Sequence, residues 1–186
     1  MDVHKAQANP QALLVIDLQA GAFDGVKCDP IDSGDRLLGR AAELLDAARA
    51  AGLPVLHVQH GEPQGVLVKG TPQWQLHPAV APLPGEACVE KQAWSAFENT
   101  ALDALLRGSG VRHLLVCGLQ SEVCVTHTSQ AALALGYEVT LASDAHGTWP
   151  DATSSADEII ARQNAALAAQ GAQLQGTREI VALLSR

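Results

Sequence analysis

The sequence lacks the features that mark several large classes of protein. It has no basic surplus, because 12 Lys and Arg stand against 20 Asp and Glu, a formal net charge of −8. Duplex binding needs a basic face, so we expect no nucleic-acid partner. No apolar run approaches the roughly 18 residues of a membrane helix, so we expect no membrane partner. Residues 1–5 show no charged segment leading into an apolar one, which favours a cytoplasmic location.

Cysteine is scarce as well, and its spacing is uninformative about metals. The four cysteines, Cys28, Cys88, Cys117 and Cys124, do not have the spacing of a metal finger. We therefore expect reduced thiols rather than disulfides or a zinc site. Cys88 and Cys117 fall inside predicted strands, where thiols usually serve as small buried apolar groups.

The chain contains a regular alternation of strand and helix patterns. Its 186 residues, 47% hydrophobic and 17% charged, are typical of a globular domain. We predict one domain over residues 1–186, with residues 1–11 as a loose N-terminal arm. The alternation predicts an α/β fold, doubly wound and Rossmann-like, with a mainly parallel sheet. Strands are predicted at 12–16, 54–59, 86–90, 111–117, 137–142 and 172–174, and helices at 35–51, 100–106, 121–135, 157–170 and 177–184.

Residues 61–85 form the least regular part of the chain. They contain five prolines and four glycines, and they separate the second predicted strand from the third. Connections of this length in a compact domain are usually lids or contact surfaces. We expect this segment to cover a site or to meet another subunit.

A strand end meets a helix start around Cys124. Strand 111–117 is almost entirely apolar, as a parallel strand covered on both faces requires. Gly118 breaks that pattern, and Ser121 followed by Glu122 is typical of a helix start. Cys124 would then lie in the first helical turn, where unpaired backbone N–H groups and the helix dipole favour a thiolate. We predict that Cys124 is a nucleophile.

Two more reactive side chains directly follow predicted strands. Asp17 follows strand 12–16, and Lys91 follows strand 86–90. Carboxyl ends of parallel strands meet at one edge of a sheet, so Asp17, Lys91 and Cys124 can converge there. Asp17 can accept the thiol proton and return it to a leaving group, while Lys91 stabilises both anions. The three residues are predicted to form a catalytic triad.

The segments around this triad resemble those of the isochorismatase-like cysteine hydrolases, a superfamily that includes nicotinamidases and N-carbamoylsarcosine amidases. Asp17 lies in Val-Ile-Asp-Leu-Gln, Lys91 in Val-Glu-Lys, and Cys124 in Cys-Gly-Leu-Gln-Ser-Glu-Val-Cys-Val. The resemblance spans residues 12–175, with the three motifs in order at the family's typical spacing. These motifs point strongly to the family and weakly to a substrate.

The resemblance implies both a fold and a reaction. It implies a three-layer αβα sandwich with a six-stranded sheet, an Asp-Lys-Cys triad and a cis peptide between Leu119 and Gln120. The backbone N–H groups of Gln120 and Cys124 would form an oxyanion hole. The thiolate would attack an amide-type carbonyl, a thioester acyl-enzyme would form, and water would hydrolyse it without a cofactor. The family also suggests a homo-oligomer, a dimer or tetramer, with residues 61–85 near neighbouring subunits.

The chain departs from the nicotinamidase pattern at a metal motif. Nicotinamidases carry Asp-x-His just after the second strand, where this chain reads Gln-His-Gly-Glu-Pro over residues 59–63. His57, His60 and His77 have no close ligand spacing, and His57 falls inside a predicted strand. We therefore expect no bound metal and no nicotinamidase activity.

Several residues near the predicted strand ends are candidate contacts for a small-molecule substrate. The candidates are Gln19, Phe23, His60, Trp94 and Gln120. Phe23 and Trp94 could equally pack beneath the loops. His146, after the fifth predicted strand, could reach the site but reads better as a polar loop residue.

The leading interpretation is a metal-independent cysteine hydrolase of a small amide, carbamoyl or lactam compound. Two alternatives stay open. One is vinyl-ether or ester hydrolysis of the isochorismatase type, which would not need the thiol. The other is a non-catalytic binding member of the family.

Overall fold

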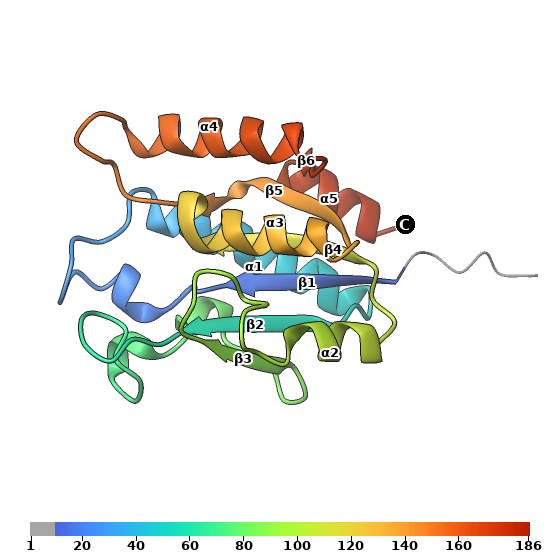
Figure 1. Ribbon diagram of the computed structural model, residues 1–186, viewed down its shortest axis with the longest axis horizontal. Coiled ribbons are helices and arrows are strands. Elements are labelled where there is room, and N and C mark those ends of the chain that lie inside the picture. Colours follow the sequence, from blue (N-terminus) through green and yellow to red (C-terminus); the bar gives the residue numbers. More distant parts are fainter. Residues whose placement is uncertain (1–9) are drawn as a thin grey trace, which may run out of the picture.

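The computed structural model describes residues 10–186, and Figure 1 shows their arrangement. The arm predicted for residues 1–11 lies mostly outside the described residues, and Gln11 already begins the first strand. The strands are β1 (Gln11–Ile16), β2 (Val55–His60), β3 (Ala87–Lys91), β4 (His113–Leu119), β5 (Glu138–Gly147) and β6 (Gln173–Gln175). The helices are α1 (Gly34–Ala50), α2 (Leu102–Gly108), α3 (Thr126–Ala134), α4 (Ala156–Ala169) and α5 (Thr177–Leu184).

The six strands form one sheet in the order β3-β2-β1-β4-β5-β6. Every neighbouring pair is parallel. The α2 and α3 helices cover the front of the sheet in Figure 1, and α1 and α5 lie behind it. The predicted fold class, a three-layer αβα sandwich with a parallel sheet, is confirmed. The strand order reverses between β1 and β4, and the carboxyl ends at such a switch point are where ligands bind in open α/β sheets.

The two layers of core are supplied by alternate residues of the same strands. In β1, Leu14 faces the cluster that includes α2 and α3, while Leu13 faces the cluster that includes α1 and α5. The same alternation occurs in β4, where Val116 and Leu115 face opposite layers. Burial on both faces explains the unbroken apolar run of the central strands.

A glycine allows β4 to approach β1 closely just before the site. Gly118 has φ +130°, and a Cβ there would lie 2.0 Å from the carbonyl oxygen of Ile16. Any side chain would therefore force the two central strands apart. This close contact positions the segment that leads to Cys124 next to the end of β1.

The fifth strand is longer than predicted, which changes the place of His146. The prediction ended this strand at residue 142, but β5 continues to Gly147 through a register shift against β4. Asp144 turns outward there, and its Oδ1 accepts hydrogen bonds from Thr177 N and Oγ1, both 2.7 Å, at the start of α5. His146 is therefore a buried strand residue and not a loop residue.

The edge strand β3 is more exposed than the sequence predicted. Cys88 was expected to be buried, but its side chain is exposed, whereas Cys117 in the central strand β4 is fully buried. At the start of the same strand, Glu86 forms an ion pair with Arg49 at 2.7 Å and accepts from His57 at 3.0 Å. These contacts lower the pKa of Glu86 to about 2, with the Arg49 hydrogen bonds contributing most. The pair lies at the amino ends of the strands.

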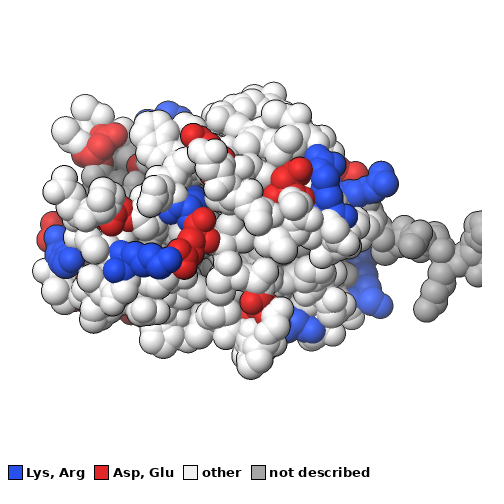
Figure 2. Space-filling model, turned by 60° about the horizontal axis from the view of Figure 1, so that its bottom comes forward, with Lys and Arg blue, Asp and Glu red and all other residues white. Residues whose placement is uncertain are grey.

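The surface carries charges of both signs. On the face drawn in Figure 2, acidic and basic side chains are interspersed among wide uncharged areas. Among residues 10–186, no helix combines the length and apolar character needed to cross a bilayer.

Candidate active site

Three predicted residues meet at the carboxyl edge of the sheet. Lys91 Nζ lies 2.7 Å from Asp17 Oδ2 and donates to Cys124 Sγ at 3.2 Å. The three side chains come from the ends of β1 and β3 and from the turn after β4. They are almost fully buried, with exposed fractions of 6% for Asp17, 3% for Lys91 and 8% for Cys124. The arrangement brings an acid, an ammonium and a thiol into one cluster.

Asp17 adopts an uncommon backbone conformation. Its φ is +51°, which is in the left-handed region. Its N–H donates to Val58 O at 3.0 Å, while its carbonyl accepts from Gln19 N at 2.8 Å. Residues other than glycine and asparagine pay an energetic cost in that region, and such residues cluster at functional sites. The turn after β1 thus aims the carboxylate at Lys91.

The Lys91 ammonium is shared among four acceptors. Besides Asp17 and Cys124, it donates to Ala93 O at 3.2 Å and faces His60 Nδ1 at 3.2 Å. An ammonium can only donate, so this contact favours the tautomer in which Nδ1 of His60 is unprotonated and Nε2 carries the hydrogen. Burial and the Lys91 charge both lower the pKa of His60. His60 is thus a neutral side chain with a fixed N–H donor.

The environment of Cys124 differs from the one that the sequence predicted. The residue lies in a π-helical turn, Ser121–Val125, that precedes α3, rather than in a regular first α-helical turn. Burial, followed by the nearby Asp17 charge, raises the pKa of Cys124 to about 12, although Lys91 opposes the shift. This shift is opposite in direction to the one that a helix start alone favours. The thiol holds its proton until a base removes it.

Asp17 is suited to be that base. Burial raises its pKa above the ordinary value, although Lys91 and the Cys124 thiol counteract part of the shift. A carboxylate with a raised pKa is a stronger proton acceptor near neutral pH. The pair can therefore react by moving the proton from sulfur to Asp17 as the sulfur attacks.

The resting protonation state can be tested by alkylation. We expect the rate of iodoacetamide modification of Cys124 to rise with pH from 6 to 9 without a plateau, because the thiol remains protonated throughout that range. The measurement is quantitative peptide mass spectrometry of the Cys124 peptide, with Cys88 as the exposed internal reference. A plateau beginning below pH 7 would show instead that a stable thiolate is present.

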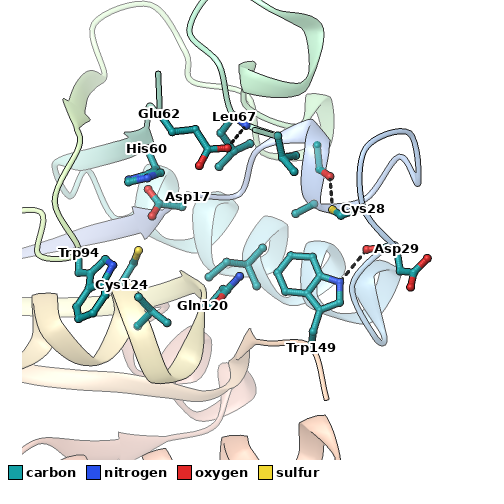
Figure 3. A pocket seen from close by; sticks show the side chains of 15 residues that line it. Asp17, Cys28, Asp29, His60, Glu62, Leu67, Trp94, Gln120, Cys124 and Trp149 are labelled. Carbon is teal, nitrogen blue, oxygen red and sulfur yellow. Dashed lines mark hydrogen bonds between the residues drawn. The ribbon is translucent and has the colours of Figure 1, made fainter. Parts of the chain in front are cut away.

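A cavity of about 520 Å³ opens above the triad. Figure 3 shows Asp17, His60 and Cys124 close together, with Trp94 beside the thiol and Trp149 at the other end of the cavity, beyond Gln120. This volume falls within the range of small-molecule sites. Its walls are formed by Asp17, Gly21, Ala22, Cys28, Asp29, His60, Glu62, Val66, Leu67, Trp94, Leu119, Gln120, Val123, Cys124 and Trp149.

Three of the predicted substrate contacts line this cavity and two do not. His60, Trp94 and Gln120 belong to its walls. Gln19 is fully buried and holds neighbouring loops together: its Nε2 donates to Trp74 O at 2.7 Å and its Oε1 accepts from His60 N at 2.9 Å. Phe23 packs against the α1 side of the core, with its ring 5.1 Å from that of His77. Gln19 therefore supports His60 from behind.

The additional candidate His146 also lies away from the cavity walls. Its Nδ1 is 2.8 Å from Ser121 Oγ and its Nε2 is 3.0 Å from Asn164 Oδ1. Through Ser121 it fixes the start of the turn that carries Cys124. Its contacts are thus those of a buried structural residue.

The peptide bond between Leu119 and Gln120 is cis. Gln120 directly follows β4, the strand next to β1 in the sheet, so it lies in the cavity wall beside the strand end that carries Asp17. Its carbonyl accepts from Val123 N at 3.2 Å and from Val125 N at 3.1 Å, which closes the turn around Cys124. The Gln120 and Cys124 backbones are therefore neighbours at the same end of the cavity.

Two wall residues on the loops were not predicted from the sequence. Glu62 lies two residues past the end of β2, and Trp149 lies two residues past the end of β5. The same strand-end rule that located Asp17 could have drawn attention to Glu62. No comparable signal pointed to Trp149, because the length of β5 was underestimated.

The histidines considered as metal ligands are separated by their contacts. His57 binds Glu86 at the amino edge of the sheet, His60 faces Lys91, and His77 accepts from Ala79 N at 3.2 Å. Within residues 10–186, no three His, Cys, Asp or Glu side chains are grouped as a metal site would require. The absence of a metal stays a prediction.

Comparison with known proteins identifies the family to which this chain is similar. A model of the isochorismatase domain matches residues 11–173. The chain is 30% identical over 176 residues to the ureidoacrylate amidohydrolase of Azorhizobium caulinodans, which covers 75% of this chain and 78% of that protein. It also superposes on the crystal structure of an isochorismatase from Pseudomonas putida with a TM-score of 0.85 and 32% identity, over 96% of this chain and 93% of that one.

A stronger sequence match covers less of the relative. The chain is 44% identical over 154 residues to a streptothricin hydrolase of Streptomyces noursei. The match covers 81% of this chain and 60% of that protein. The chain therefore spans less than two thirds of that relative's length.

Proposed function

Because this chain belongs to the isochorismatase family, we propose that it is a cysteine hydrolase that cleaves a C–N bond in a small amide, carbamoyl or lactam compound. The observation that carries the proposal is the position of Lys91 Nζ, 2.7 Å from Asp17 and 3.2 Å from Cys124 at the base of a cavity. The names of two relatives, a streptothricin hydrolase and a ureidoacrylate amidohydrolase, support hydrolysis. The second name supports an amide as the group attacked.

The first half of the reaction forms a thioester. Asp17 accepts the Cys124 proton as the sulfur bonds to the substrate carbonyl carbon, and the carbonyl electrons move to oxygen. The backbone N–H groups of Gln120 and Cys124 bind this oxyanion. Collapse of the tetrahedral intermediate breaks the C–N bond, and Asp17 returns the proton to the departing nitrogen.

The second half regenerates the thiol. A water molecule attacks the thioester carbonyl while Asp17 accepts one of its protons. Collapse expels Cys124 sulfur, which recovers the proton, and releases the carboxylic acid. Lys91 offsets the negative charge on Asp17 or on sulfur in each step, and the Nε2–H of His60 is available to hold the substrate.

A substrate panel tests this proposal directly. The purified chain is incubated with primary amides, N-carbamoyl amino acids, lactams, and esters, and release of amine or acid is measured. We expect turnover of at least one compound with a C–N bond. Turnover confined to esters or vinyl ethers would contradict the proposed bond type, and no turnover of any class would support a non-catalytic member.

We also propose that the chain assembles as a homo-oligomer, a dimer or tetramer, in which residues 61–85 lie near a neighbouring subunit. Three residues of this segment, Glu62, Val66 and Leu67, line the cavity of their own chain. Light scattering coupled to gel filtration measures the assembly, and a monomer at micromolar concentration would contradict it. A cytoplasmic location and the absence of a cofactor stay predictions.

A further inference from the structure

The cavity wall carries a surplus of negative charge. Its acidic members are Asp17, Asp29 and Glu62, and no Lys or Arg of residues 10–186 belongs to the wall. Asp17 is paired with Lys91 just beneath the wall. Glu62 has no such cation in the wall, so the space above the thiol favours positively charged groups.

Glu62 is held in place by the turn that it begins. Its Oε1 accepts from Leu67 N at 2.7 Å, and its own N–H donates to Leu67 O at 3.1 Å. Gly65 completes the turn with φ +114°, and a Cβ there would lie 2.5 Å from Oε1. The turn thus closes tightly around the carboxylate. A surface glutamate that is merely solvated would need neither the backbone donor nor the glycine.

The fixed carboxylate faces the reactive end of the cavity. Figure 3 shows Glu62 on the same wall as His60, with its carboxylate directed into the cavity above Asp17. The Glu62 charge also opposes the lowering of the His60 pKa, which places its field at the triad. The exposed ammonium of Lys27 lies beside this turn, but it donates to Gly65 O at 3.0 Å. Lys69 is paired with Glu90.

The far end of the cavity has the same character. The Asp24 and Asp29 charges add to burial in raising the pKa of Cys28, which lines that end. Trp149 is fixed there by its Nε1, which donates to Asp29 O at 2.7 Å. Trp94, 60% exposed, stands at the thiol end with its ring 4.9 Å from that of His127. Indole faces attract ammonium and guanidinium groups, so the aromatic walls reinforce the carboxylates.

We propose that Glu62 is a specificity-determining residue that binds a positively charged group of the substrate, so that the preferred substrates are amides or lactams carrying an amine or guanidinium group. This inference rests on the proposed hydrolysis, because only a hydrolase has such a substrate. The preference for a positive charge is itself a property of the cavity. While Cys124 attacks the carbonyl, the cation of the same molecule occupies the space beside Glu62. Neutral amides of equal size would bind without this contact.

The charge selection can be measured without turnover. In the full chain with Cys28→Ser and Cys88→Ser, Cys124 is modified with the cationic reagent 2-(trimethylammonium)ethyl methanethiosulfonate or the anionic 2-sulfonatoethyl methanethiosulfonate. Each rate is divided by that reagent's rate with 2-mercaptoethanol. We expect the cation to be favoured about tenfold, and Glu62→Gln to reduce the preference about fivefold. Gln keeps an oxygen that can accept from Leu67 N, so the turn is retained.

Two comparisons make the result decisive. Glu43→Gln, the same change of charge on α1, is the matched control and should leave the preference unchanged. The second readout is kcat/KM for 6-aminohexanamide relative to hexanamide, which should favour the cationic amide in a Glu62-dependent way.

Equal normalised labelling rates, or a preference that Glu62→Gln does not reduce, would overturn the inference. Amide hydrolysis without charge preference would also overturn it while leaving the proposed function intact. Cation-selective labelling that depends on Glu62, without hydrolysis of any amide, would support the inference and remove the proposed reaction.

Discussion

Cys124→Ala is expected to lower kcat/KM for the best C–N substrate by at least about four orders of magnitude. The substitution removes the only thiol that Lys91 contacts among the described residues, 3.2 Å from its ammonium. Without sulfur, no thioester can form, and water would have to attack the amide directly. The measurement is the steady-state rate of amine release by wild type and variant under the same conditions.

A remote thiol provides the control for this loss. Cys88 is exposed on the edge strand β3 and does not line the cavity, so Cys88→Ser should retain wild-type kcat/KM. If Cys124→Ala keeps a substantial part of the turnover while Asp17 substitutions abolish it, the covalent route is wrong. That result would favour the vinyl-ether or ester reaction that acid chemistry alone can catalyse.

Asp17→Asn is expected to lower kcat/KM by about two to four orders of magnitude. An amide cannot accept the Cys124 proton, and the pKa of the thiol, about 12, leaves almost no thiolate at neutral pH without that base. In the wild type, kcat/KM should fall as the pH decreases through the pKa of Asp17, which burial raises above its ordinary value. The residual activity of the variant should lack this acid limb. Rate profiles from pH 4 to 9 measure both effects.

A second ion pair separates the loss of a base from the loss of a buried contact. Glu86 pairs with Arg49 at the opposite edge of the sheet, so Glu86→Gln should lower the midpoint of denaturant unfolding while kcat/KM stays near that of the wild type. Asp17→Asn should change the rate far more than Glu86→Gln does. An Asp17→Asn variant that is as active as wild type at pH 7 would exclude Asp17 as the proton acceptor.

The sequence predicted the placement of the triad because that placement follows from topology. Strand patterns before Asp17, Lys91 and Cys124 indicated strands of one parallel sheet, and parallel strands deliver their ends to one edge. The family model confirms the resemblance that the motifs around these residues indicated. The strand ends were accurate to one or two residues, apart from β5, whose polar residues Ser143 and Asp144 suggested a loop. Asp144 is tolerated there because it caps α5.

Protonation states and wall residues depend on distances that no sequence pattern carries. The predicted thiolate at Cys124 followed from a helix start, but the folded site adds burial and the Asp17 charge, which outweigh it. Gln19 was expected to contact the substrate because it follows a strand. Its side-chain amide is instead hydrogen-bonded to the backbone of His60 and Trp74. Glu62 became recognisable only when the turn to Leu67 placed its carboxylate in the wall.

Detection of a covalent intermediate is the most direct test of whether Cys124 is the nucleophile. The protein is mixed with 4-nitrophenyl acetate, quenched in acid within seconds, and analysed by intact-protein and peptide mass spectrometry. We expect a mass increase of one acetyl group located on Cys124, with none at that position in Cys124→Ala and much less in Asp17→Asn. Steady release of nitrophenol by the wild-type protein, with no acyl group on Cys124 at any time, would contradict the role of Cys124 as the nucleophile.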